Sequence, residues 1–319
     1  MTDPALTVVL PVHNGMPYLE AALGSILTQT YADFHILAID DGSTDGSGEY
    51  LDQVGDERLT VLHQPCAGLG AVLNRGIALC ATPFLARMDA DDISLPNRFE
   101  LQMAALLADP ELIAVGSPLD FLVHGTQQRG LIYPFEHGAI VGDLLRGQSS
   151  LSHPTLLMRT EAARATCYRI AGAGEDLDFC LRLAEYGKIG NLPTAQYLYR
   201  LHETSISMTK QGEIERGYAY ARLTATQRRE GLPETPFTEF AETWERRGAL
   251  SRVRTRLVSV SFGRYRRARL AWARRAYMQS AVDICVSLVL QPLSAGRLLV
   301  RKMTPRGATQ SLPALPRSE

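Results

Sequence analysis

Short apolar runs alternate with amphipathic stretches along the first hundred residues, and this alternation constrains the fold more than any other feature. The runs are rich in β-branched residues, as in the buried strands of a parallel sheet. The stretches between them place apolar residues at helical spacing, as in MPYLEAALGSILTQTY (16–31). Regular succession of strand and helix predicts an α/β fold, with helices on both faces of a mostly parallel or mixed sheet. The predicted strands are LTVVLPV (6–12), FHILAID (34–40), RLTVLHQ (58–64), PFLARMD (83–89) and SHPTLLMR (152–159).

Polar residues gather where three of these strands end. Residues 12–14 (Val-His-Asn) close the first strand, residues 40–41 (Asp-Asp) the second, and residues 89–91 (Asp-Ala-Asp) the fourth. Ligands of open α/β sheets bind beyond the carboxyl ends of the strands. We therefore expect these three clusters to converge on one ligand pocket.

The third cluster is unusually acidic. Asp89, Asp91 and Asp92 follow directly behind an apolar run, and the only base close to them in the sequence is Arg87. A hard divalent cation such as Mg²⁺ binds one or two carboxylates together with phosphate oxygens. We therefore expect a metal ion to supply the positive charge and a diphosphate to accompany it. The alternative is a solvated turn in which Asp92 caps the following helix.

Composition places the chain among ordinary globular proteins. Its 319 residues are 45% hydrophobic and 21% charged, which fits one large domain with an appendage. The five cysteines form no CxxC pair, so we expect neither a disulfide framework nor a zinc site, and a reducing compartment. The sequence MTDPALTVVLPVHNG lacks the basic start and long apolar stretch of a signal peptide. These features predict a cytoplasmic protein.

Charge divides the chain into two regions. Residues 246–319 carry 16 basic and two acidic residues, whereas the other 245 residues carry 17 basic and 32 acidic residues. The most apolar part of the basic region, ICVSLVLQPLSAG (284–296), is 13 residues long, short of the roughly 20 that a membrane-spanning helix needs. A basic amphipathic segment suits an anionic membrane surface, and the alternative is a helical hairpin docked on the acidic domain. We expect a catalytic domain over 1–210 and a helical, Arg-rich region over 211–319 whose last residues, 304–319, are disordered.

Seven blocks of the sequence follow one another in a recognisable order. They are VVLPVHNGMPYLEAALGSILTQTY, LAIDDGSTDGS, GLGAVLNRGI, ARMDADDISLPNRFELQ, SHPTLLMR, GEDLDFCLRLAEYGKIGNLP and YRLHETSIS. In this order the blocks resemble the family 2 glycosyltransferases, the inverting enzymes with the GT-A nucleotide-sugar fold. The resemblance runs from about Leu6 to Ser207 and does not extend into the region after 211. It implies a single catalytic domain that binds a nucleotide-sugar and a divalent cation, Mn²⁺ or Mg²⁺.

The resemblance also implies roles for individual residues. Asp41 would bond the base or ribose, and Asp89 and Asp91 would hold the ribose and the metal-bound diphosphate, with Asp91 the more direct ligand. His202 would add a metal ligand or a phosphate donor. The expected nucleotide-sugar contacts are Pro11, Val12, His13, Asn14, Asp41, Asn74, Arg75, Asp89 and Ala90, and the expected metal ligands are Asp91, Asp89 and His202.

Inverting transfer needs a base that takes the proton of the acceptor hydroxyl. Asp176, in GEDLDF, matches the family's position for this base, and Glu175 and Asp178 are its neighbours and competitors. Acidic residues in a first helical turn also favour the helix dipole without any catalytic role. We expect Asp176 to be the base, with Glu175 and His153 on the acceptor side.

Two departures from the family pattern refine the expected activity. The QxxRW block of processive members is absent, since Gln227-Arg228-Arg229 is followed by Glu230. This favours transfer of one sugar to a hydroxyl in a surface glycan or a lipid-linked oligosaccharide. His13 replaces the common Tyr and would alter stacking on the base. UDP is the favoured nucleotide, no nucleic-acid partner is expected, and the enzyme would lie on the inner face of the cell membrane.

Two other functions compete with this interpretation. A nucleotidyltransferase also combines an α/β fold with paired acids and a metal, but it would normally carry a basic, Gly-rich phosphate loop that LPVHNGMPYLE lacks. A catalytically inactive scaffold at the membrane surface would use the basic region alone. The presence of Asp89, Asp91 and Asp176 disfavours the scaffold.

Overall fold

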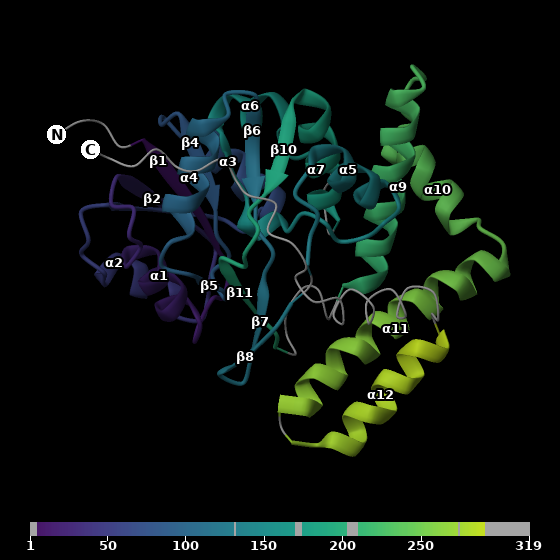
Figure 1. Cartoon of the computed structure of the whole chain (residues 1–319). Coiled ribbons are helices and arrows are strands. Elements are labelled where there is room, and N and C mark those ends of the chain that lie inside the picture. The colour runs from purple at the N-terminus through teal and green to yellow at the C-terminus, as the bar shows by residue number, and fades with distance from the viewer. Residues whose placement is uncertain (1–4, 131, 170–173, 203–209, 274, 291–319) are drawn as a thin grey trace.

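The computed structural model describes residues 5–130, 132–169, 174–202, 210–273 and 275–290. The predicted disorder of residues 304–319 lies outside these ranges. The described chain forms a central sheet with helices on both faces, a small second sheet and a helical C-terminal part (Figure 1). The predicted α/β class, mixed sheet and helical C-terminal extension are therefore confirmed.

The central sheet has seven strands and is mostly parallel. Only β9 runs antiparallel to its neighbours, β4 and β6, so the sheet is mixed. The first four strands along the chain match the predicted apolar runs, whereas the run 152–159 is a short 3₁₀ turn, His153–Thr155, followed by a short strand. In spatial order the strands are β10 (Lys188–Asn191), β6 (Leu112–Gly116), β9 (Leu157–Arg159), β4 (Phe84–Arg87), β1 (Leu6–Val12), β2 (Phe34–Asp41) and β3 (Leu59–Gln64).

Alternating side chains of β1 bury two apolar layers. Leu6, Val8 and Leu10 pack in one core against helices α1, α2 and α4, while Val9 packs in the other against α3, α5, α6 and α7. Gly76 of α3 lets that helix approach the sheet, because a Cβ atom there would lie 2.5 Å from Val9 Cγ1. The helices are α1 (Leu19–Leu27), α2 (Ser47–Gln53), α3 (Leu69–Leu79), α4 (Arg98–Ala108), α5 (His137–Leu145), α6 (Thr160–Thr166) and α7 (Glu175–Tyr186).

A second, four-stranded sheet lies at the carboxyl ends of the central strands. Its order is β5–β11–β7–β8, and β11 pairs in parallel with β7 and antiparallel with β5. Because β5 follows the acidic cluster and β11 precedes His202, this sheet brings the two segments together. The strands are β5 (Ile93–Ser94), β7 (Asp120–Val123), β8 (Thr126–Gln128) and β11 (Tyr197–Arg200).

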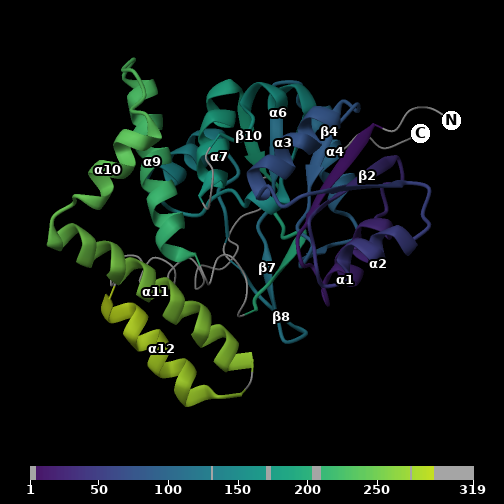
Figure 2. The ribbon, with the colours of Figure 1, turned by 180° about the vertical axis from the view of Figure 1, so that it is seen from behind.

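The C-terminal helices extend from the edge of the α/β part of the chain. Both views show α9 beside α7, and α11 and α12 paired as a hairpin near the second sheet (Figures 1 and 2). Leu270 of α11 packs against Val123 of that sheet and against Leu201, the residue after β11, so the hairpin docks on the rest of the chain. Within the described chain, no helix is both long and apolar enough to cross a membrane. The helices are α9 (Gln211–Arg229), α10 (Phe237–Glu245), α11 (Ala249–Ala273) and α12 (Tyr277–Leu290).

Candidate active site

Two loops at the ends of β1 and β2 are tied to each other. The backbone N–H of Asn14, whose φ is 52°, donates to Ser43 Oγ at 2.9 Å, and Asn14 Oδ1 accepts the N–H of Thr44 at 2.8 Å. Gly15 N–H donates to Ser47 Oγ at 2.9 Å. The side-chain oxygen of Asn14 thus joins two loops. One follows the buried residues Pro11 and Val12 of β1, and the other follows β2.

Asp41 is anchored at the end of β2 by three donors. Its carboxylate accepts hydrogen bonds from Gln64 Nε2 at 2.7 Å and from the backbone N–H groups of Ala67 and Gly68, both at 2.8 Å. Burial alone would raise the pKa of Asp41, but these hydrogen bonds outweigh it and lower the pKa below its ordinary value. Asp41 is therefore a fixed carboxylate.

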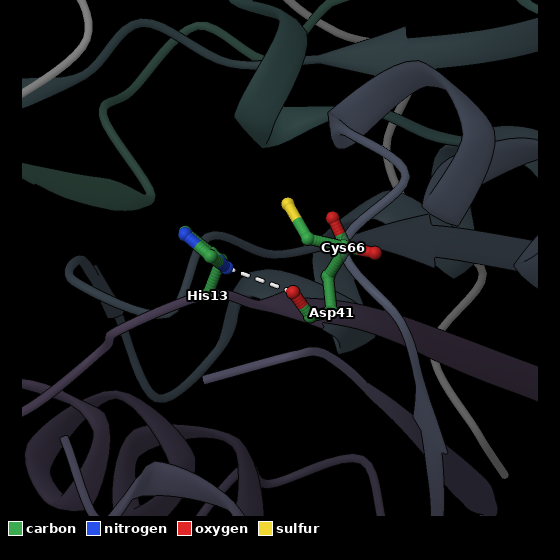
Figure 3. A group of neighbouring side chains, drawn as sticks. All are labelled: His13, Asp41 and Cys66. Carbon is green, nitrogen blue, oxygen red and sulfur yellow. Dashed lines mark hydrogen bonds between the residues drawn. The ribbon is translucent and has the colours of Figure 1, made fainter. Parts of the chain in front are cut away.

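His13 lies beside Asp41 with one tautomer favoured. Its Nδ1 donates to the main-chain oxygen of Asp41 at 2.8 Å (Figure 3). Asn14 Nδ2 approaches His13 Nε2 at 3.3 Å. A carbonyl can only accept and an amide nitrogen can only donate, so the proton of the neutral ring belongs on Nδ1. Ligand-type atoms of His13, Asp41 and Cys66 lie within 4.8 Å of one another. They form a polar cluster at the predicted nucleotide end of the site.

Arg75 is connected to this polar cluster by hydrogen bonds, whereas Asn74 is bonded elsewhere. Arg75 Nη1 donates to Gln64 Oε1 at 2.7 Å, and Gln64 in turn donates to Asp41. Asn74 instead donates to the carbonyl of Tyr168 and accepts its N–H, both at 2.7 Å. The structure joins Arg75 to Asp41, whereas the amide of Asn74 fastens α3 to the segment after α6.

The acidic cluster is assembled as the sequence predicts. Oxygen atoms of Asp89, Asp91 and Asp92 lie within 4.8 Å of one another directly after β4. His202 Nε2 lies 2.9 Å from Asp91 Oδ2, and the His202 ring lies 5.0 Å from that of Tyr18. Carboxylate oxygens are the ligands that Mg²⁺ and Mn²⁺ prefer, and the half-buried Asp91 can present them to the site. The donor set therefore fits a hard divalent cation.

Part of the positive charge beside this cluster comes from the protein itself. Arg87, which is buried, forms an ion pair with Asp89 through two contacts of 2.7 and 3.1 Å. Burial raises the pKa of Asp89, Arg87 opposes this shift, and Asp91 adds to it. Arg87, the one base near this cluster in the sequence, thus supplies part of the charge that we expected from a metal ion.

Arg98 is a second buried base that the sequence analysis missed. Its Nη2 donates to the carbonyl of Arg87 at 2.7 Å, and its guanidinium lies 5.1 Å from the ring centre of Tyr197. Burial lowers the pKa of Arg98 to about 10. A base at the start of an amphipathic helix ordinarily faces solvent, so no local pattern indicates this position.

Asp92 has a different role from the predicted helix cap. Helix α4 begins at Arg98, with Asn97 as its N-cap residue. Asp92 is fully buried and accepts the backbone N–H of Arg200 at 2.7 Å. Burial and then the charges of Asp91 and Asp89 raise its pKa well above the ordinary value. Asp92 therefore fastens the acidic cluster to β11, and the cap interpretation is wrong.

The candidate base lies at the start of α7. Tyr218, from α9, donates its hydroxyl to Asp176 Oδ2 at 2.9 Å. Burial raises the pKa of Asp176, and the hydrogen bond from Tyr218 opposes that shift. Burial and the neighbouring Asp176 charge raise the pKa of Glu175 to about 7. Arg87 lowers the pKa of both acids, so the same guanidinium acts on Asp89 and on this pair.

Asp178 and His153 are placed away from open space. Asp178 is 1% exposed and forms ion pairs with Arg169 at 2.8 Å and Arg182 at 2.9 Å. His153 is 5% exposed and its Nε2 contacts the hydroxyl of Tyr168. Burial and then Arg87 lower the pKa of His153 well below its ordinary value. Both side chains are embedded in packing behind the site.

Tyr218 is the contact that the sequence analysis could least anticipate. It lies in α9, beyond the predicted domain boundary at residue 210 and outside every block of the resemblance. Helix α9 nevertheless packs on α7, since Ala221 and Ala225 share a core cluster with Leu177 and Leu181. Tyr218 and Asp176 are 42 residues apart in the sequence, and only the packing of α9 on α7 brings the hydroxyl to the carboxylate.

Comparisons with known proteins place this site in context. Residues 7–164 match the model of glycosyl transferase family 2. The chain is 30% identical over 245 residues to the O-antigen biosynthesis glycosyltransferase WbnJ of Escherichia coli, covering 74% of this chain and 92% of WbnJ. An uncharacterized glycosyltransferase of Haemophilus influenzae is 29% identical over 220 residues, which are 64% of this chain and 68% of that protein.

Two solved structures share the fold. Residues 1–349 of TarS from S. aureus, crystallised in complex with UDP, superpose with a TM-score of 0.54 at 15% identity, covering 90% of this chain and 91% of that one. The mannosyltransferase PcManGT of Pyrobaculum calidifontis, in complex with GDP-Man and Mn²⁺, gives 0.52 at 17% identity, covering 94% and 79%. These likenesses confirm the GT-A type of fold. The match to WbnJ and to the family model shows that the chain is a glycosyltransferase and belongs to glycosyl transferase family 2.

Proposed function

We propose that the protein is an inverting, metal-dependent glycosyltransferase that moves one sugar from a nucleoside-diphosphate sugar to a hydroxyl acceptor. The observation that carries this proposal is that two pairs of carboxylates lie near one buried arginine, Arg87. Asp89 and Asp91 form one group after β4, Asp176 and Glu175 form the other at the start of α7, and Arg87 acts electrostatically on both.

The nucleotide end would be formed by the loops after β1 and β2. Asp41 is an ionised acceptor held rigidly by Ala67 and Gly68, which suits hydrogen bonding to a base or ribose. Pro11, Val12, His13 and Asn14 would line this end, and Arg75 would act through Gln64. UDP is our preferred nucleotide, on the basis of the family resemblance and of the UDP complex of TarS.

The cation, Mn²⁺ or Mg²⁺, would be held by Asp91 with Asp89 and His202. A bound divalent cation stabilises the negative charge that develops on a departing diphosphate. Asp89 is already paired with Arg87, so the half-buried Asp91 is the more available ligand. The Mn²⁺ complex of PcManGT supports the choice of metal.

Transfer would proceed by a single displacement. Asp176 takes the proton of the acceptor hydroxyl, while the oxygen of that hydroxyl forms a bond to the anomeric carbon. The bond between that carbon and the diphosphate oxygen breaks on the opposite face, and the electron pair leaves with the nucleoside diphosphate. Tyr218 donates to Asp176 Oδ2 and would hold this carboxylate in place for the proton transfer. Glu175, with its pKa raised to about 7, would contact the acceptor side.

The acceptor would be a surface glycan or a lipid-linked oligosaccharide. The name of the E. coli relative, an O-antigen biosynthesis enzyme, supports this class. The absence of a QxxRW block supports transfer of a single sugar. Exposed apolar residues of α12 beside a basic α11 support peripheral attachment to an anionic membrane from the cytoplasmic side, with no nucleic-acid partner.

Release of nucleoside diphosphate from nucleotide-sugars tests the proposal without a known acceptor, because glycosyltransferases also transfer slowly to water. The purified chain is incubated with UDP-, GDP- and dTDP-sugars and Mn²⁺, and the released diphosphate is measured. We expect release from at least one donor, lost in EDTA and in Asp91→Ala. Release that persists at the wild-type rate in EDTA would contradict the metal assignment, and equal release by Asp91→Ala would contradict the residue.

A further inference from the structure

A cavity lies between the second sheet and the α11–α12 hairpin, away from the candidate active site. It has a volume of about 410 Å³ and is lined by residues of the segment after β8 and of both helices, among them Gln128, Arg129, Tyr265, Arg269, Trp272 and Ser280. This volume falls within the range of small-molecule sites, roughly 300–1,000 Å³. None of the described residues that line it carries a carboxylate.

Arg269 gives the cavity an unbalanced positive charge. Arg269 is 8% exposed. Its guanidinium carbon lies 4.1 Å from the ring centre of Phe121. Nη2 donates to the carbonyl of Arg129 at 2.8 Å, but Nε and Nη1 have no hydrogen-bond partner within the described chain. A buried charge without a partner is costly, so an anionic ligand would be strongly favoured here.

The hairpin has no acid left for Arg269. Asp283 is the only acidic residue in the sequence between 249 and 290. Arg264 Nη1 lies 2.7 Å from Asp283 Oδ1, and Gln279 donates to the other oxygen at 3.0 Å. The protein therefore neutralises the half-buried Arg264 of the hairpin and leaves the buried Arg269 for a ligand.

The surroundings of the cavity indicate where its anion comes from. Trp272 lines the cavity, is 57% exposed, and packs edge-on against Tyr277, which is 53% exposed. On α12, Met278, Val282 and Val289 are 85%, 54% and 80% exposed and recur at helical spacing. An aromatic pair beside an exposed apolar stripe is typical of a surface at a membrane interface. An anion bound beside such a surface would come from a lipid phosphate.

We propose that this cavity binds the phosphate of a lipid headgroup, with Arg269 as its anchor and the apolar stripe of α12 against the acyl chains. The same charge would also attract free phosphate, but free phosphate does not use the exposed apolar stripe. The proposal does not depend on transferase activity, because neither the cavity nor the stripe includes a residue of the candidate active site.

Calorimetry on the full chain tests this site with a soluble lipid. Dihexanoyl phosphatidylglycerol below its micelle concentration is compared with inorganic phosphate and with dihexanoylglycerol, which lacks phosphate. We expect one saturable site for the phospholipid, weaker binding of phosphate and none of dihexanoylglycerol. Phosphate that binds as tightly as the phospholipid would overturn the lipid assignment, and absence of binding by either would overturn the site.

Matched variants identify the anchor. Arg269→Gln should weaken phospholipid binding about ten- to hundredfold, the range for a hydrogen bond to a charged group. Arg267→Gln removes the same charge from an exposed position of α11 and should bind like wild type. Equal weakening by both would show diffuse attraction and overturn the proposal.

A second variant covers the case in which Arg269→Gln does not fold. Ile284→Trp fills the cavity from α12 and retains Arg269. It should weaken phospholipid binding as Arg269→Gln does, whereas wild-type affinity in a folded Ile284→Trp would overturn the proposal. UDP binding, measured on the same samples, should be unchanged in every variant, so that failure at this cavity is separated from failure at the nucleotide site.

Discussion

At the scale of single residues, the three acids at the start of α7 have three different environments. Asp178 is locked between two arginines, Glu175 has its pKa raised to about 7, and Asp176 is held by Tyr218. All three look alike in the sequence GEDLDF. We base the proposed catalytic role of Asp176 and the structural role of Asp178 on these different partners.

Replacing Asp176 with Asn should abolish proton transfer while leaving the fold and nucleotide affinity intact. An amide cannot take the hydroxyl proton, so kcat should fall by about 10²–10⁴-fold, measured with the true acceptor or with the slow transfer to water. Glu175→Gln should cost less. Asp178→Asn is the structural control and should lower the melting temperature, because it breaks a buried ion pair. Wild-type turnover in Asp176→Asn with a dead Glu175→Gln would reassign the base to Glu175.

Replacing Tyr218 with Phe should change the pH dependence of turnover. The hydroxyl of Tyr218 lowers the pKa of Asp176, so its removal should raise that pKa further. A base works only when deprotonated, and the acidic limb of the kcat/KM profile should therefore shift to higher pH. Donor KM should stay close to wild type. An unchanged acidic limb in a folded Tyr218→Phe would remove Tyr218 from its positioning role.

At the scale of elements, the junction of α7 and α9 depends on a glycine. Gly174 has a φ of 99°, and a Cβ atom there would lie 2.9 Å from Gly217 Cα. Gly174→Ala should therefore destabilise the protein by more than the roughly 1–2 kcal/mol of left-handed backbone strain alone, measured by denaturant unfolding. Gly212→Ala, in α9 with nothing within 4 Å, is the control and should be neutral or stabilising. Equal stability of both variants would contradict this packing.

The sequence predicted local elements well and long-range contacts poorly. The run 6–12 became β1 without change, and the stretch 16–31 with helical spacing contains α1 (Leu19–Leu27), because strand and helix periodicity are local properties. The strand at 188–191 was missed because its identity depends on pairing with β6 at the sheet edge. In the site, the acidic cluster was predictable from spacing, whereas Arg98 and Tyr218 depend on packing between distant segments.

At the scale of the whole molecule, an acidic catalytic domain carries a basic hairpin that both docks on it and exposes apolar residues. Docking is shown by Leu270 and Arg269, which pack against the second sheet. The exposed residues Met278 and Val289 lie on the other helix of the hairpin. The two arrangements that the sequence left open, docking and membrane binding, are therefore compatible.

The full chain should float with vesicles that contain phosphatidylglycerol. Each arginine near an anionic surface contributes about 1 kcal/mol, and this attraction should fade as salt is raised. Vesicles of phosphatidylcholine alone should recover much less protein. Met278→Glu should reduce flotation. Leu107→Glu, at an exposed position of α4, is the control and should float like wild type. A chain that stays out of anionic vesicles at low salt would contradict membrane attachment.

The most direct test of the central claim is binding of UDP, measured by calorimetry with Mn²⁺ and with EDTA, in wild type and in Asp91→Ala. The clustered acids and the diphosphate repel each other, and a cation held by Asp91 removes that repulsion. We predict binding by wild type only with Mn²⁺, with GDP and dTDP as comparisons, and loss of the metal-dependent affinity in Asp91→Ala. Equal UDP affinity in EDTA and Mn²⁺, or in Asp91→Ala and wild type, would contradict the account.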